Sequence, residues 1–393
     1  MRIIRSQQDL EAFVRGCAGA PFITVDTEFM RERTYWPQLC LIQVARPPET
    51  GDDAGSDDDA AIIDPIDGAD LDLAPFFELM ANPSVVKVFH AARQDVEIFQ
   101  HLSGAPPTPL YDTQVAAMVC GFGDQVGYET LVRKIAGGAL DKSSRFTDWS
   151  RRPLSEKQLT YALADVTHLR EIYLELSSQI EAAGRAHWVA EEMAVLADPA
   201  TYIVEPDEAW LRLKTRSSNG RFLAVAKALA AWREREAQTR NVPRNRLLKD
   251  DALLEICANQ PKTQQELGRS RLLFREGRRP DIVEGILAAV KEGVETPKAA
   301  QPDPPPQRPA RNGAGPLADL LRVLLKARAE EIGVAQRLLA SAADLDAIAH
   351  EDEPDTPALL GWRREAFGEE ALRLKRGEIA LSAGPDGVRV VPV

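Results

Sequence analysis

The chain has 393 residues, of which 44% are hydrophobic and 27% are charged, so it is ordinary globular material and too long for one domain of typical size. Its four cysteines lie far apart without a C-x-x-C pair, which argues against a zinc ribbon, a redox motif or a disulfide-rich secreted fold. The net charge is −12, and no stretch approaches the ~18 apolar residues of a membrane span. We expect a cytoplasmic protein of two or three domains with no membrane partner.

The charge is unevenly distributed. Residues 1–200 carry 17 Lys and Arg against 31 Asp and Glu, a net of −14, whereas residues 206–292 carry 18 against 12, a net of +6. Residues 316–393 carry 10 against 14, a net of −4. The loop at residues 49–59 (ETGDDAGSDDD) is too polar to pack, and we expect it to be a disordered insertion between strands.

The first half of the chain predicts strands followed by alternating strands and helices. The predicted strands are residues 2–4, 22–29, 39–45, 61–64 and 85–90, and the predicted helices are residues 9–17, 73–80 and 91–102. The second and third strands are close in sequence, so we expect them to be antiparallel. Three strands in a run and then β-α alternation predict an α/β mixed sheet with helices on its faces.

The predicted strand at residues 22–29 carries the first candidate site. Asp26 and Glu28 are two residues apart, so they lie on one face of the strand, ~6.6 Å apart along it. Carboxylates that close repel one another unless a positive group lies between them, and Mg²⁺ and Mn²⁺ take oxygen ligands of this kind. An acidic strand end that faces water is the simpler alternative, and the D-x-E pair alone does not exclude it.

Two later acidic residues have ordinary structural explanations. Asp95 lies at the start of the helix that follows the strand at residues 85–90, where a carboxylate also compensates the helix macrodipole. Asp112 is a natural N-cap for a helix running to Cys120, and we interpret it as structural.

A late helix carries the remaining candidates. Ser155 and Gln158 form an S-x-x-Q capping box, which specifies where the helix starts. Tyr161 and Asp165 follow, and their spacing of four places both side chains on one face, ~6 Å apart. A half-buried aromatic residue and a surface acid are the alternatives.

Together these residues resemble the three exonuclease motifs of the DEDD superfamily, in its tyrosine-bearing subclass. The segments VDTEF, LCLIQVA, VFHAARQD and RPLSEKQLTYALADV resemble ribonuclease D, and the resemblance covers the first ~200 residues. It implies a ribonuclease-H-like nuclease domain at residues 1–200. The related subclass has a histidine five residues before its last aspartate, where this chain has Thr160. The tyrosine subclass therefore fits better.

The resemblance also implies the chemistry. It implies a 3′-5′ exoribonuclease that releases nucleoside 5′-monophosphates with two divalent cations, Mg²⁺ or Mn²⁺, ~3.5 to 4 Å apart. By similarity Asp26 would bridge both ions, Glu28 and Asp165 would hold the ion that carries the attacking water, and Asp95 would serve the other. Tyr161 would orient that water. The expected partner is RNA with a free 3′ end, transfer RNA precursors above all.

The basic middle of the chain, residues 206–292, predicts a small helical bundle. The predicted helices are residues 209–213, 221–240, 249–258, 264–267 and 280–291. WLRLK, AWRE and VPRNRLL resemble the helicase and RNase D C-terminal (HRDC) domain, which implies nucleic-acid binding. Five arginines are the candidates for phosphate contact: Arg269, Arg271, Arg275, Arg278 and Arg279. A solvated helix face is the alternative.

The end of the chain predicts a linker and a second bundle. Residues 293–315 are rich in proline and are expected to form neither helix nor strand. Residues 317–380 are expected to be helical, as a second, divergent HRDC-like all-α bundle at residues 316–384. Its net acidity does not favour contact with nucleic acid.

Two other functions compete with the exoribonuclease. A DNA 3′-5′ exonuclease would use the same chemistry, but the chain has no helicase motif, and a ribonuclease can sense the terminal 2′-OH. A catalytically inactive RNA-binding scaffold is the other alternative. The presence of all five active-site residues argues against it.

Overall fold

The computed structural model describes residues 1–393 apart from 49–58, 69, 142–146, 274–278, 305–314 and 386. The chain forms two compact units. Unit 1 comprises Met1–Glu28, Cys40–Thr201 and Ala310–Val393, and unit 2 comprises Phe29–Leu39 and Tyr202–Pro309. The helices of the described part are all too short or too polar to cross a membrane.

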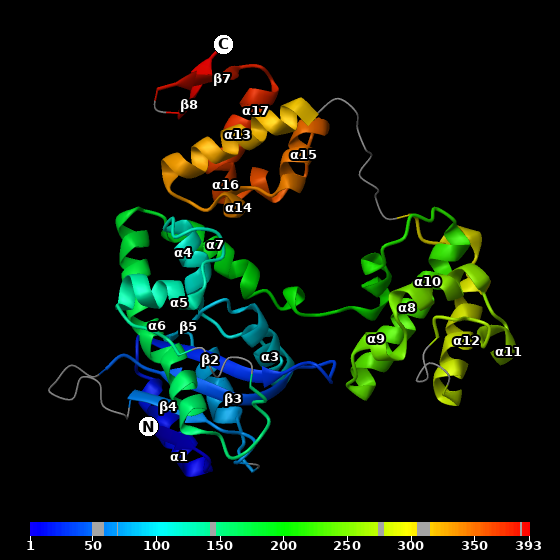
Figure 1. Ribbon diagram of the computed structural model, residues 1–393, viewed down its shortest axis with the longest axis horizontal. Coiled ribbons are helices and arrows are strands. Elements are labelled where there is room, and N and C mark those ends of the chain that lie inside the picture. Colours follow the sequence, from blue (N-terminus) through cyan, green and yellow to red (C-terminus); the bar gives the residue numbers. More distant parts are fainter. Residues whose placement is uncertain (49–58, 69, 142–146, 274–278, 305–314, 386) are drawn as a thin grey trace. The chain divides into compact units, whose positions relative to one another are not determined.

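Unit 1 is built on a mixed six-stranded sheet, whose strands β2 to β5 are labelled in Figure 1. The strand order is β1-β4-β3-β2-β5-β6. Its strands are β1 (Arg2–Ile4), β2 (Phe22–Met30), β3 (Gln38–Ala45), β4 (Ala60–Ile63), β5 (Val86–Phe89) and β6 (Leu110–Asp112). β5 is parallel to both β2 and β6, and β4 is parallel to β1 but antiparallel to β3. The predicted mixed sheet is therefore confirmed.

Helices that include the predicted ones at residues 9–17, 73–80 and 91–102 accompany the sheet strands. They are α1 (Gln7–Cys17), α2 (Ala74–Ala81), α3 (Arg93–Ser103), α4 (Thr113–Val119), α5 (Tyr128–Leu131), α6 (Glu156–Ala182) and α7 (Ala186–Leu196), with a π-helical turn at Val132–Ala136. The capping box of Ser155 and Gln158 starts α6, as predicted. Asp112 caps α4 through the backbone N–H of Gln114, also as predicted.

Helix α6 packs on the sheet through its apolar face. Leu169 is buried with Phe22 of β2 and Val88 of β5, and Val166 is buried with Ala45 and Ala60. This packing fixes the helix that carries Tyr161 and Asp165 against the strands.

The C-terminal part of unit 1 is a helical bundle with a hairpin. It contains α13 (Gly315–Ile332), α14 (Gln336–Leu339), α15 (Ala342–His350), α16 (Gly361–Arg363), a π-helical turn (Arg364–Gly368), α17 (Glu369–Lys375), β7 (Ile379–Gly384) and β8 (Gly387–Pro392). The predicted all-α bundle at residues 316–384 is wrong at its end, because β7 and β8 form a hairpin there. Ile379 anchors the hairpin because its side chain is buried in the core of the bundle.

This bundle shares one hydrophobic core with α6 and α7 of unit 1. Leu321 and Leu324 of α13 belong to the same buried cluster as Ile172 and Leu176 of α6. The indole rings of Trp188 and Trp362 stack with centroids 4.6 Å apart and an interplanar angle of 18°. Two polar contacts also join the bundle to α7 and α4. Arg363 pairs with Glu192 at 2.7 Å, and the N–H of Ala335 donates to the carbonyl of Met118 at 3.0 Å.

Unit 2 is a separate helical bundle. It contains a 3₁₀ helix (Pro206–Arg212), α8 (Gly220–Arg240), α9 (Arg244–Leu247), α10 (Asp250–Asn259), α11 (Gln264–Leu267) and α12 (Pro280–Glu295). The segment Phe29–Leu39 belongs to this unit. The N–H groups of Tyr35 and Trp36 donate to Asn241 at 3.1 and 3.0 Å, and the hydroxyl of Tyr35 donates to the buried carboxylate of Glu234.

The expectation that residues 293–315 contain no helix is wrong at both ends. α12 continues to Glu295, a 3₁₀ turn spans Lys298–Ala300, and α13 begins at Gly315. Gly293 explains the longer α12, because it packs against α8 so closely that a Cβ would lie 2.4 Å from the Cα of Val225. Most prolines of the predicted linker come later in the sequence, at residues 302–309.

The acidic loop was predicted to be disordered from residue 49 to residue 59. Residues 49–58 lie outside the described part of the chain. Asp59 is described and is buried, because its carboxylate pairs with Arg46 at 3.2 Å. For this residue the prediction is wrong.

Candidate active site

Three carboxylates converge at the C-terminal part of β2. Asp26, Glu28 and Asp165 each place one carboxylate oxygen within 4.8 Å of those of the other two. Asp26 and Glu28 come from β2, and Asp165 comes from α6. The hydroxyl of Thr24 donates to the carbonyl of Val166 at 2.8 Å, so the turn of α6 next to Asp165 is tied to the strand.

Asp95 is buried beside this group without belonging to it. The hydroxyl of Thr27, between Asp26 and Glu28 on β2, donates to the Asp95 carboxylate. The exposed fraction of Asp95 is 7%. Its helix, α3, follows the strand next to β2 in the sheet, which explains how an acid 69 residues after Asp26 comes to lie beside the same strand.

The electrostatics of the cluster favour a cation. Burial, and then the charge of Asp165, raise the pKa of Asp26 well above its usual range. Burial, followed by the charges of Asp26, Asp165 and Asp95, raises the pKa of Glu28 to about 10. Burial is also the main cause of the raised pKa of Asp95. Acids of this kind become ionised at neutral pH when hard divalent cations bind them, and the donor set, carboxylate oxygens only, suits Mg²⁺ and Mn²⁺.

The cluster opens into a cavity of about 540 Å³. The walls come from β2, from the turn between β5 and α3, and from α5 and α6. The lining residues are Asp26, Thr27, Glu28, His90, Ala91, Gln114, Gly127, Tyr128, Glu129, Thr130, Leu140, Tyr161, Asp165 and Leu169. A cavity with carboxylates on one wall and apolar and aromatic groups on others can take a nucleotide at the end of a chain.

Tyr161 lies in this cavity one helical turn before Asp165. Burial, followed by the negative charges of Asp165, Glu28 and Asp26, raises the pKa of its hydroxyl. The phenol therefore stays protonated and can donate a hydrogen bond. The ring of Trp149 stacks on it with centroids 6.3 Å apart and an interplanar angle of 28°.

Asp112 has a second role that sequence reasoning missed. Besides capping α4, its two carboxylate oxygens accept from the N–H groups of Ala91 and Ala92, each at 2.9 Å. Ala91 lines the cavity with φ 59°, a left-handed conformation that is costly for a residue with a Cβ. The buried carboxylate stabilises this turn. No signal in the sequence marks Ala91.

Tyr128 was also not predicted. Its hydroxyl donates to the carbonyl of Ala164 at 3.0 Å, directly before Asp165, and its ring lies 5.4 Å from that of His90. It therefore joins the α5 wall of the cavity to the helix that carries Asp165.

Three of the five arginines proposed for phosphate contact lie in the described part of the chain. Arg269 and Arg271 are exposed in unit 2. Arg279 is exposed too but pairs with Asp281 at 3.2 Å. Arg275 and Arg278 lie outside the described residues.

Comparisons with known proteins find relatives of the chain. Residues 1–181 match the family model described as 3′-5′ exonuclease, and residues 222–290 match the HRDC domain. The chain is 56% identical to ribonuclease D of Jannaschia sp. over 99% of both chains. It is 51% identical to ribonuclease D of Granulibacter bethesdensis over 99% of this chain and 95% of that protein.

A solved structure is similar over almost the whole chain. It is RNase D of Escherichia coli, described as an exoribonuclease involved in structured RNA processing. The sequence identity is 30% and the TM-score is 0.82, over 95% of this chain and 98% of that one.

Proposed function

Because the chain belongs to the ribonuclease D family of 3′-5′ exoribonucleases, we propose that it hydrolyses RNA at the carboxylate cluster of β2 and α6. The observation that carries this proposal is the convergence of Asp26, Glu28 and Asp165 within 4.8 Å, in a cavity that also holds Tyr161. Asp95, which is buried and accepts from Thr27 of β2, completes the set.

We propose that these four carboxylates hold two divalent cations, Mg²⁺ or Mn²⁺. When bound, the cations would supply a water that is nucleophilic at neutral pH and would neutralise charge on the leaving oxygen. Asp26, Glu28 and Asp165 would hold them from the cavity. Thr27 would keep the Asp95 carboxylate oriented through its hydrogen bond.

Tyr161 would orient the attacking water. Its raised pKa keeps the hydroxyl protonated, so it donates a hydrogen bond and does not abstract a proton. Trp149 limits the motion of the ring by stacking on it.

The substrate we propose is structured RNA with a free 3′ end, with transfer RNA precursors as the first class to test, in the cytoplasm. The description of the Escherichia coli relative supports structured RNA. The net charge of +6 on residues 206–292 supports RNA contact by the first HRDC domain, including Arg269, Arg271 and Arg279. Residues 1–200 would be the nuclease domain, and residues 316–384 a second, divergent HRDC-like domain after the segment at residues 293–315.

The test uses RNA and DNA single strands of one sequence, labelled at the 5′ end. We expect stepwise shortening of the RNA from its 3′ end in Mg²⁺ or Mn²⁺ and none in EDTA. Asp26→Asn and Asp95→Asn should each abolish hydrolysis, because an uncharged amide replaces a negatively charged carboxylate ligand of the cations. Glu171→Gln, an exposed acid on α6, is the control and should behave as wild type.

Two results would change the proposal. Wild-type turnover in Asp26→Asn or Asp95→Asn would overturn the site. Equal shortening of both strands would favour a DNA or mixed-specificity exonuclease.

A further inference from the structure

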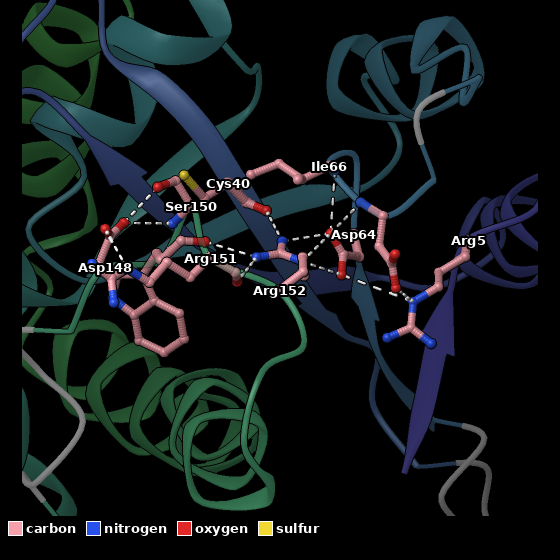
Figure 2. A network of polar contacts seen from close by, with 10 residues as sticks. Arg5, Cys40, Asp64, Ile66, Asp148, Ser150, Arg151 and Arg152 are labelled. Carbon is pink, nitrogen blue, oxygen red and sulfur yellow. Dashed lines mark hydrogen bonds and ion pairs between the residues drawn. The ribbon is translucent and has the colours of Figure 1, made fainter.

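The guanidinium group of Arg152 joins the segment at residues 148–153, just before α6, to the sheet. Arg152 donates from Nε to the Asp64 carboxylate at 2.8 Å and from Nη2 to the carbonyl of Cys40 at 2.9 Å. Its Nη1 donates to the carbonyls of Trp149 and Arg151, both at 2.8 Å (Figure 2). One side chain thus joins this segment to β3 and to the end of β4.

Asp64, which accepts from Arg152, is buried and has further hydrogen-bond donors. Its side chain is 1% exposed, and that of Arg152 is 12% exposed. The carboxylate also accepts from the N–H groups of Ile66 and Asp67 at 3.2 and 3.1 Å. A buried ion pair persists only when its hydrogen bonds are satisfied in this way, and a lysine cannot reproduce the planar fork of donors.

The segment that Arg152 holds reaches the proposed catalytic tyrosine. Trp149, whose carbonyl accepts from Arg152, is 2% exposed, and its ring stacks on Tyr161. Gln158, in the first turn of α6, donates to the hydroxyl of Thr147 at 3.2 Å. Arg152 therefore holds the backbone of the residue whose ring stacks on Tyr161, next to the point where Gln158 ties α6 to Thr147.

We propose that Arg152, together with Asp64, is a positioning residue for hydrolysis that acts through Trp149 on Tyr161. The inference rests on the proposed role of Tyr161 as the group that orients the attacking water. The pair touches neither the cavity nor the carboxylate cluster, so its effect on the rate passes through the position of the tyrosine.

The experiment is a double-mutant cycle with Arg152→Lys and Tyr161→Phe. A short RNA with a free 3′ end is the substrate, Mg²⁺ is present, and all proteins are assayed well below their melting temperatures. Arg152→Lys should lower kcat roughly 10- to 100-fold with little change in KM, because small displacements of a positioning group cost that much. In the Tyr161→Phe background the same substitution should cost no more than about two-fold, because the group it positions is already lost.

Arg5→Gln is the matched control. Arg5 also approaches Asp64, at 3.9 Å, but its side chain is 44% exposed and its closer partner is Asp67 at 2.7 Å. Wild-type kcat is expected for it. If Arg152→Lys does not fold, Asp64→Asn, which keeps the shape and one acceptor oxygen, takes its place in the cycle.

The outcomes separate this inference from the site assignment. Equal loss in both backgrounds, or wild-type kcat in Arg152→Lys, would overturn the role of Arg152 while an impaired Tyr161→Phe still upheld the site. Failure of the site itself would appear independently, as an active Asp26→Asn. A wild-type rate in Tyr161→Phe would overturn both the role of the tyrosine and the inference.

Discussion

At the scale of single residues, the site is a set of acids that the fold crowds together. Asp26, Glu28 and Asp95 all have pKa values raised chiefly by burial, and each is raised further by a neighbouring carboxylate. Leaving such groups without cations costs free energy, because desolvation and like charge both oppose ionisation. Metal binding and proton release are therefore coupled at this site.

Tyr161→Phe tests the proposed hydrogen-bond donor. The substitution keeps the ring that stacks on Trp149 and removes only the hydroxyl, so RNA affinity should be nearly unchanged. The single-turnover rate should fall by roughly 10² to 10⁴. An unchanged rate would leave Tyr161 a packing role only.

Glu28→Gln tests the electrostatics. In the metal-free protein the pKa of Glu28 is raised from 4.5 to about 10, so its contribution to stability is present at low pH and is lost as the pH rises toward 10. In EDTA, the melting temperature of Glu28→Gln relative to wild type should therefore rise steadily from pH 6 to pH 9. Parallel pH profiles for the two proteins would show that Glu28 is not strained by its neighbours.

At the scale of elements, the site depends on how two helices are joined to the sheet. α6 is started by its capping box and tied to β2 through Thr24. The turn into α3 is held in a left-handed conformation at Ala91 by the buried carboxylate of Asp112. These anchors place Asp165 and Asp95 beside the same strand.

Asp112→Asn tests the turn. An amide can present only one acceptor oxygen, so at least one of the N–H groups of Ala91, Ala92 and Gln114 loses its partner. A buried donor left without a partner costs about 1 to 3 kcal/mol, and the free energy of unfolding should fall by that amount. Activity should fall as well, because Ala91 lines the cavity. Asp124→Asn, an exposed acid in the loop after α4, is the control and should change neither quantity.

At the scale of the whole molecule, the C-terminal bundle and the nuclease helices share one hydrophobic core. The buried cluster runs from Ile172 of α6 to Leu321 of α13 and includes Trp362. Unit 2 has its own core, which includes Trp210. The two units should therefore respond separately to mutations in their cores.

Trp362→Ala and Trp210→Ala form the matched pair for this expectation. Loss of a buried tryptophan costs about 3 to 5 kcal/mol. Trp362→Ala should lower the temperature at which hydrolysis of a short RNA is lost, whereas Trp210→Ala should leave that temperature nearly unchanged. If Trp362→Ala does not change the temperature at which hydrolysis is lost, the bundle does not stabilise the nuclease domain.

Local spacing in the sequence was enough to predict the features that depend on near neighbours. The spacing of Asp26 and Glu28, the capping box at Ser155, and the pairing of Tyr161 with Asp165 on one helix face all follow from periods of two and of about four residues. The sequence did not predict helix ends that depend on packing between distant segments, such as the end of α12. Nor did it predict the hairpin after α17.

Which residues converge from far along the chain became visible only in the folded protein. Asp95 meets Thr27 across 68 residues, and Arg152 meets Asp64 across 88. Such partners are selected by burial and hydrogen-bond satisfaction in the packed interior, which local propensity does not encode. For the same reason the sequence indicated Asp112 as a helix cap but could not indicate the turn at Ala91 that it also holds, nor the core that the C-terminal bundle shares with α6.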